Sequence, residues 1–264
     1  MAEKPFFVRP LPFDVTTIGN ETPGAPAKHL AQFKHSGMIW RSSGNGNLYA
    51  EGDFGTTKDV DFCALMATNA TSSATIRLRL SPSFAGLTQN PHYDSGPQTI
   101  RSPAITRDDG LYHSHLELPQ TESRRCWRID IAGQSGNFEA SALVLGKKVT
   151  ADSFYSAEYG FGAEDLGDIE LSRFGVPEEQ PGLIYRRLDF TMDWLDLDYF
   201  ETYFRPLIER LGKREVVYCC FDPEATVYRQ SRTYMGWLRE DPFATVGGIK
   251  AGKVSLPFSI LSMF

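Results

Sequence analysis

The sequence lacks the features that would place it in a membrane or in an export pathway. No stretch of its 264 residues approaches the roughly 20 consecutive apolar residues needed to cross a bilayer. The N-terminus, Met-Ala-Glu-Lys-Pro-Phe-Phe-Val-Arg, has neither the apolar run nor the small-residue cleavage site of a signal peptide. We therefore expect a protein that is made in the cytoplasm and does not insert into a membrane.

Cysteine is scarce, and its spacing excludes a disulfide framework. The four cysteines are Cys63 in an apolar run, Cys126 before a tryptophan, and the adjacent pair Cys219 and Cys220. Adjacent residues of a strand point to opposite faces, so this pair forms neither a relaxed disulfide nor a chelating pair. We expect all four to be buried thiols.

An excess of positive charge is also missing, since the net charge is −6. Residues 1–149 hold 15 Lys and Arg against 14 Asp and Glu, whereas residues 150–264 hold 12 against 19, so the halves carry +1 and −7. Recognition of nucleic acid requires clustered cations that neutralise phosphates. Sequence-specific nucleic-acid binding is therefore not expected.

No convincing catalytic constellation is present. His113 and His115 would share a face of a strand with Glu117 beyond them, but a third committed metal ligand is not evident, and exposed strand histidines are the preferred interpretation. Residues Gly247–Lys253 match the first seven positions of a phosphate-binding loop, yet Val254 stands where Ser or Thr is required and a strand pattern follows. We expect no enzymatic activity, no cofactor and no metal site.

What the sequence does contain is a change of pattern near residue 150. Before it, short alternating segments separated by turns predict a β-sandwich, as in Val60–Leu65, Ala74–Leu80 and Trp127–Ile131. After it, one amphipathic helix over Leu197–Leu211 is expected, kinked or split at Pro206. Strands are predicted around it at Ile169–Phe174, Leu183–Met192, Val216–Phe221, Ser231–Leu238 and Lys253–Leu261, with the Gly-rich passage from Tyr159 to Asp168 as a connection.

Residues 1–29 contain five prolines interleaved with aromatic side chains, which predicts an extended arm rather than a helix. The arm could pack on its own chain or on a neighbouring subunit, and the sequence does not decide between them.

Two groups of short motifs resemble known proteins. The residues from Trp40 to Asn69, together with Arg124–Ile131 and Phe138–Gly146, resemble discoidin-like (galactose-binding-like) jelly rolls of tailed-bacteriophage tail proteins. The later part of the chain, from Tyr185–Phe190 through the expected helix to Val216–Pro223 and Tyr234–Gly236, is similar to the C-terminal part of minor or distal tail proteins. The usual terminal disulfide and a clear calcium loop of sugar-binding discoidin relatives are absent.

The resemblance implies a mainly β protein with a jelly-roll β-sandwich at 30–149 and an α+β domain at 150–264, the latter with a β-barrel-like sheet and one main helix. It also implies a structural virion protein of a phage tail tip, which forms a closed ring between tail tube and hub and lets DNA pass. Six subunits are preferred and three are the alternative. Tail tube, tape-measure and hub proteins are the implied partners.

Candidate site residues follow from this hypothesis. Ring contacts are assigned to Phe6, Phe7 and Phe13 of the arm. A lumen that repels DNA is assigned to six carboxylates: Glu164, Asp165, Asp168, Glu170, Asp193 and Asp196. The alternative function is a carbohydrate-binding module that contacts host surface glycans, with Tyr93 or Tyr112 stacking on a sugar.

Overall fold

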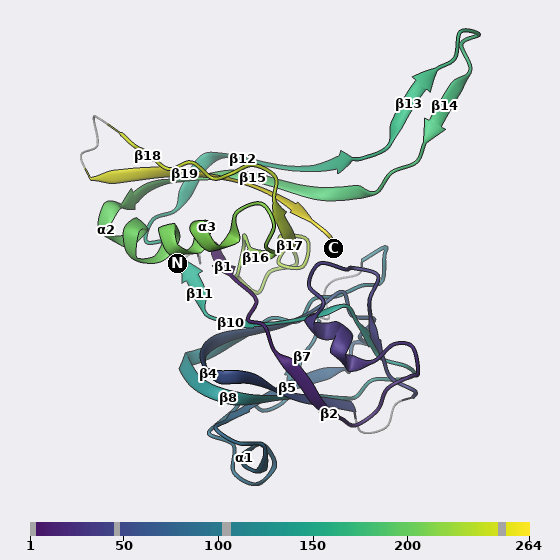
Figure 1. Cartoon of the computed structure of the whole chain (residues 1–264), viewed down its shortest axis with the longest axis vertical. Helices are drawn as coiled ribbons and strands as arrows, with labels where there is room; N and C mark the ends of the chain where they lie inside the picture. The colour runs from purple at the N-terminus through teal and green to yellow at the C-terminus, as the bar shows by residue number, and fades with distance from the viewer. Residues whose placement is uncertain (1–3, 45–47, 102–106, 248–251) are drawn as a thin grey trace.

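The computed structural model describes residues 4–44, 48–101, 107–247 and 252–264. Strands dominate the fold, and Figure 1 shows two packed bodies with a long hairpin that reaches out from one of them. Within these ranges no helix is long and apolar enough to span a membrane. The predicted fold class is confirmed, because a β-sandwich precedes a sheet that carries one main helix.

The first body contains nine strands and two short helices among the described residues. The strands are β2 (Asp14–Ile18), β3 (Trp40–Arg41), β4 (Leu48–Met66), β5 (Thr75–Ser81), β6 (Tyr93–Asp94), β7 (Gln98–Thr99), β8 (Leu116–Ala132), β9 (Glu139–Ala140) and β10 (Ala142–Gly146). The helices are η1 (Ala27–Ala31) and α1 (Phe84–Gln89).

The second body contains the remaining strands and the main helix. The strands are β1 (Phe6–Val8), β11 (Lys148–Thr150), β12 (Tyr155–Asp165), β13 (Asp168–Leu171), β14 (Pro177–Gln180), β15 (Ile184–Asp196), β16 (Val217–Cys220), β17 (Thr233–Leu238), β18 (Thr245–Val246) and β19 (Lys253–Ser262). The main helix consists of α2 (Leu197–Tyr199), the π-helical turn η2 (Phe200–Phe204) and α3 (Arg205–Leu211).

The sandwich is built around the two long strands β4 and β8. Their antiparallel pairing shifts register between Asp53 and Lys58, which divides the sheet into two halves. One half continues through β2, β5, β6 and β7, and the other continues into β10. Apolar residues of both halves share one core, in which Trp40 and Trp127 are fully buried.

The end of β4 is buried on both faces. Cys63 and Leu65 point into the sandwich core, while Phe62, Ala64 and Met66 point into a second apolar layer formed with β1, β16 and β17. Burial on both faces explains why this segment reads as a continuous apolar run. The two bodies are therefore joined through a buried apolar interface.

The sheet of the second body has the order β11-β1-β16-β17-β19-β15-β12. Strand β1 lies between β11 and β16, with Phe7 facing the main helix and Phe6 facing the interface layer. The adjacent cysteines behave as predicted: Cys219 faces the helix side and Cys220 faces the interface layer. All four cysteines are buried and free, which confirms the prediction.

The main helix covers one face of this sheet with Phe200, Phe204, Leu207 and Leu211. Its predicted interruption at Pro206 is confirmed, because a π-helical turn precedes α3 and the proline occupies the first turn of α3. Proline lacks a backbone N–H and its ring would collide with the carbonyl four residues earlier in a regular α-helix. The widened turn accommodates both effects.

The structure decides one alternative that the sequence left open and differs from one expectation. The N-terminal arm packs on its own chain, since β1 joins the second body and β2 pairs with β4 in the first. The expected connection around Tyr159 is instead the strand β12, whose Tyr159 and Phe161 contact Phe221. Gly160 and Gly162 suit this strand because it pairs on one side with β15 and forms the edge of the sheet.

The candidate phosphate loop lies partly in residues 248–251, outside the described residues. The segment after it is the strand β19, as expected, so no helix N-terminus is available there to face a phosphate.

Candidate functional site

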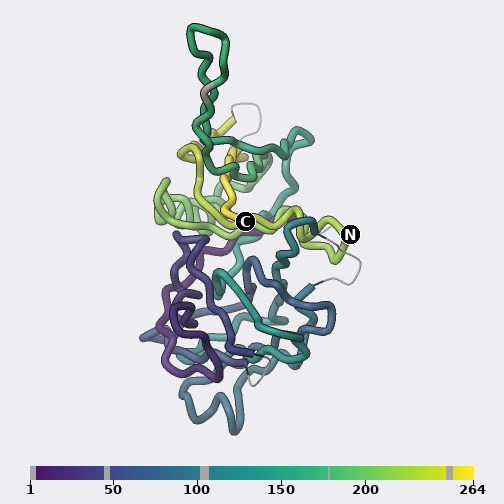
Figure 2. The backbone as a smooth tube through the Cα atoms, turned by 90° about the vertical axis from the view of Figure 1, so that its right-hand side faces the viewer, coloured from purple at the N-terminus to yellow at the C-terminus, as the bar shows by residue number. Residues whose placement is uncertain are grey.

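A two-stranded hairpin, β13 and β14, is the most conspicuous surface feature (Figures 1 and 2). It projects from the end of β12 and β15 and pairs with neither of the large sheets. Its large apolar side chains are exposed: 68% for Ile169, 73% for Leu171 and 77% for Phe174. Exposed apolar surface of this extent is typical of an interaction site, because contact between apolar side chains and water is unfavourable and a partner would remove it.

Local chemistry explains why the hairpin forms. At the tip, the Val176 N–H donates to Ser172 Oγ, and Gly175 has a φ of +75°, which residues with a side chain rarely adopt. At the neck, Gly167 and Gly182 approach so closely that a Cβ on Gly182 would lie 2.1 Å from the Gly167 nitrogen. The sequence thus specifies a narrow neck and a tight tip.

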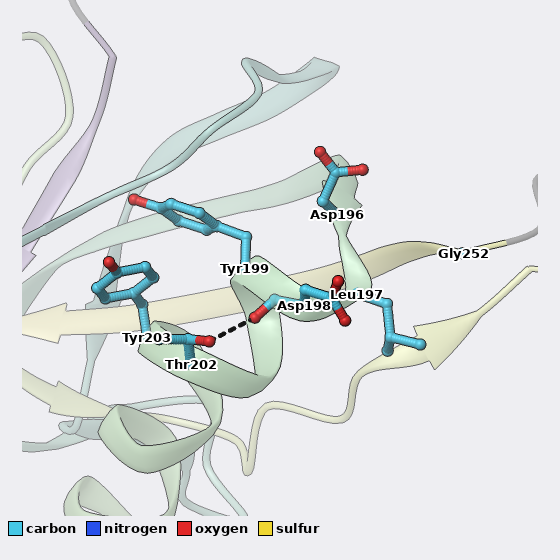
Figure 3. A pocket seen from close by; sticks show the side chains of 7 residues that line it. All are labelled: Asp196, Leu197, Asp198, Tyr199, Thr202, Tyr203 and Gly252. Carbon is cyan, nitrogen blue, oxygen red and sulfur yellow. Dashed lines mark hydrogen bonds between the residues drawn. The ribbon is translucent and has the colours of Figure 1, made fainter.

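A second candidate surface, which we call the tyrosine shelf, lies where β15 runs into the main helix (Figure 3). It is an open depression of about 590 Å³ lined by Asp196, Leu197, Asp198, Tyr199, Thr202, Tyr203 and Gly252.

Internal hydrogen bonds hold the shelf in place. The Tyr199 hydroxyl donates to the Thr150 carbonyl at 2.6 Å, and burial raises the pKa of Tyr199. The centroid of the exposed Tyr203 ring lies 4.6 Å from the centroid of the Tyr199 ring. Asp196 pairs with Lys253, whose hydrogen bond lowers the pKa of this carboxyl. The shelf thus presents an exposed aromatic ring beside a fixed carboxylate.

The arm aromatics assigned to ring contacts are buried within their own chain, which corrects that assignment. Phe6 and Phe7 are 2% and 0% exposed, and Phe13 packs against Trp127 with ring centroids 4.8 Å apart. They stabilise the fold and offer no surface to a neighbour.

The six carboxylates assigned to a lumen do not share one surface. Glu164 and Asp165 end β12, and Asp168 and Glu170 lie on the hairpin, whereas Asp193 and Asp196 lie at the opposite end of β15. Along an extended strand this separation is roughly 35 Å.

Several of these carboxylates also have partners. Arg239 Nε lies 2.7 Å from Glu164, Asp196 pairs with Lys253, and Ser255 donates to Asp193 at 2.6 Å. The prediction that all six carboxylates of one chain form a single acidic lining is therefore wrong.

The two tyrosines assigned to sugar stacking are not open platforms. Tyr112 is 4% exposed and lies beneath the Arg101 guanidinium, 4.4 Å from its ring centroid. Tyr93 is half-buried and packs against the sandwich core from β6. A glycan site on the sandwich would need other residues.

The histidine pair is buried rather than exposed, which corrects that expectation. His113 Nδ1 accepts a hydrogen bond from the Ala67 N–H, and burial lowers the pKa of His113 to about 3. His115 Nε2 instead lies 2.8 Å from Glu117 Oε1. The described residues contain no group of three side chains placed to hold a metal ion.

Sequence reasoning missed the hairpin surface although its signal is visible. Ile169 and Leu171 alternate with Asp168 and Glu170, which predicts one buried face. The structure contains no partner for that face among the described residues, so the buried-face pattern is itself the sign of an interaction.

Comparison with known proteins gives a fold-level similarity for one part of the chain. No family model matches the sequence, and no curated protein matches it significantly. Among solved structures, a chain of the complex of reduced XRCC1 with the DNA polymerase β catalytic domain has a TM-score of 0.42 at 10% identity, covering 52% of this chain and 98% of that one.

Two carbohydrate-binding modules give similar values. CBM32-3 from a Clostridium perfringens family 31 glycoside hydrolase has a TM-score of 0.40 at 11% identity, covering 51% of this chain and 91% of that module. Chitosan-binding module 1 from a Paenibacillus sp. IK-5 chitosanase/glucanase has 0.37 at 14%, covering 52% and 98%. Similarity at this level gives no basis for assigning a ligand to this chain.

Proposed function

We propose that this protein is a structural subunit that assembles with copies of itself through the projecting hairpin. The observation that carries the proposal is the exposure of Ile169, Leu171 and Phe174 on a hairpin that is fixed at its neck and that no other part of the described chain covers. Isolated two-stranded hairpins are only marginally stable in water. A partner that covers the apolar residues supplies the missing burial.

Within this function, the tip of a bacteriophage tail is the setting we propose, with a closed ring that joins the tail tube to the hub. The support is the sequence resemblance to tail proteins and a fold with a β-sandwich and a separate helix-bearing sheet. The net charge of −7 on residues 150–264 disfavours tight binding of DNA by this part of the chain, because carboxylates repel phosphate.

The test is the solution mass of the purified chain, measured by light scattering after size exclusion, with negative-stain images. We expect the mass of an oligomer, several times 29.6 kDa, and rings with an open centre. The variant Ile169→Ser/Leu171→Ser/Phe174→Ser should remain at 29.6 kDa with unchanged circular dichroism, because it alters exposed residues. A wild-type monomer at all concentrations would refute self-assembly.

A second candidate function, contact with a host glycan, is favoured by the tyrosine shelf. Sugars stack on exposed aromatic rings and donate hydroxyl protons to carboxylates, and Tyr203 and Asp198 offer both groups (Figure 3). A glycan array tests this candidate with the wild-type chain and Tyr203→Ala. Selective binding of a glycan that is lost in Tyr203→Ala supports this candidate. If no glycan is bound selectively, glycan contact is refuted and the structural function is the one that stands.

A further inference from the structure

A groove between the two bodies is lined mainly by cations on its polar side. It has a volume of about 460 Å³ and lies between the end of β1, β4, β11 and the main helix. Its cations are Arg9, Lys58, Lys147, Lys148 and Arg210, against the single carboxylate Asp59. Its apolar wall is formed by Leu11, Val149, Pro206 and Leu207, with Tyr203 at the edge.

Three of the groove cations have no carboxylate partner. Lys147 lies 3.8 Å from Asp59, and Lys148 pairs with Glu117. For Arg9, Lys58 and Arg210 the described residues contain no ion pair. In an otherwise acidic protein, three unpaired cations beside an apolar wall favour a ligand that is both acidic and apolar.

The hairpin has that chemistry. Residues 168–180 contain four carboxylates and one arginine, a net charge of −3. The register pairs Ile169 with Glu179 and Leu171 with Pro177, so these residues share one face, while Asp168 and Glu170 lie on the other. A groove can contact both faces of an inserted hairpin, whereas a flat surface contacts only one. A groove can therefore meet the apolar face and the acidic face at the same time.

The hairpin of the same chain does not fill the groove. Figure 1 shows the hairpin projecting away from β4 and β11, and its neck is fixed by the close contact of Gly167 and Gly182. The two complementary surfaces thus lie on different parts of one molecule. Such surfaces join copies head to tail, the type of contact that closes into a ring when the rotation per subunit permits.

We propose that the groove between the two bodies receives the hairpin of a second copy of this chain. The apolar residues of the hairpin pack on the wall formed by Leu11, Val149 and Pro206, and its carboxylates face Lys58 and Arg210. This inference rests on the proposed self-assembly and adds to it the receiving surface.

Charge reversal on each side tests the pairing. Asp168→Lys/Glu170→Lys changes the hairpin and Lys58→Glu/Arg210→Glu changes the groove, and each variant alone should associate at least about tenfold more weakly than wild type. Mixing the two variants should restore association, because each hairpin then meets a groove of opposite charge. Lys28→Glu, on an exposed lysine of the sandwich, is the matched control and should associate normally.

Cross-linking tests the location. Because the four native cysteines are buried, Arg173→Cys at the hairpin tip and Thr57→Cys in the groove supply the accessible thiols. A mixture of the two variants treated with a short bis-maleimide should yield a cross-linked dimer, whereas Arg173→Cys mixed with Lys28→Cys should not.

The outcomes separate the two proposals. Restored association and the Arg173–Thr57 cross-link support the groove as the receiving surface. If hairpin variants dissociate but groove variants assemble as wild type, the self-assembly stands and the groove assignment is overturned. If the wild-type chain is a monomer at every concentration, both are overturned.

Discussion

Strand β1 provides a sharp test of whether the N-terminal arm is built into the sheet of the second body. Phe7 is fully buried, with its ring centroid 4.5 Å from that of Phe258 and 6.0 Å from that of Phe190. Replacing a buried phenylalanine by alanine removes apolar burial and leaves a cavity, at a cost of about 3–5 kcal/mol. That is a large share of a typical folding free energy of about 5–15 kcal/mol.

Phe7→Ala should therefore lower the urea midpoint clearly and the melting temperature by about 10 °C for a chain of this length. The matched control is Phe174→Ala, the same substitution at a position 77% exposed on the hairpin, which should change the free energy of unfolding by no more than about 0.5 kcal/mol. Both are measured by urea denaturation monitored by circular dichroism at low protein concentration.

Equal effects of the two substitutions would refute this placement of β1. If Phe7→Ala had a small effect on stability but abolished association, the result would support the alternative in which the N-terminal arm packs on a neighbouring subunit.

Three further predictions concern the interior. Burial lowers the pKa of His113 to about 3, against roughly 6.5 in the unfolded chain, so the free energy of unfolding should fall as the pH drops from 6.5 toward 3, by about 2 kcal/mol at pH 5. The variant His113→Asn keeps an acceptor for the Ala67 N–H and should make the free energy of unfolding, measured by urea titration, less dependent on pH. An unchanged pH dependence would contradict this account of His113. Burial raises the pKa of Cys220 to about 12, and all four thiols should stay unreactive to an aromatic disulfide reagent until urea unfolds the chain; prompt labelling of Cys220 would show that the interface opens. Gly236→Ala should destabilise by about 2 kcal/mol or more because its Cβ would lie 1.7 Å from the Leu261 oxygen, whereas Gly160→Ala meets no atom within 4 Å and should be tolerated; thermal melts compare the two.

Local patterns predicted much of the fold because they report which faces are buried. Alternation identified β5, the end of β4 and β19, and the opposite faces of Cys219 and Cys220 followed from strand geometry alone. The break at Pro206 followed from its missing N–H.

Partners of a buried face are not encoded locally, and the remaining differences arise there. The aromatic side chains of Phe6 and Phe7 indicate that this segment is buried, but the neighbouring sequence does not specify that they pair with Cys220 and Cys219, more than 200 residues away. An aromatic side chain such as Tyr112 has the same local pattern whether it covers a core or stacks on a sugar. The alternation at Ile169 and Leu171 is typical of a strand with one buried face, yet both side chains are exposed and no other part of the described chain covers them.

Self-assembly through the hairpin is tested most directly by the mass of the chain in solution, with and without the apolar residues of the hairpin. We predict that the wild-type protein has the mass of an oligomer, several times 29.6 kDa, and that Ile169→Ser/Leu171→Ser/Phe174→Ser folds normally as a monomer of 29.6 kDa. A wild-type monomer, or a variant that assembles as well as the wild type, would contradict it.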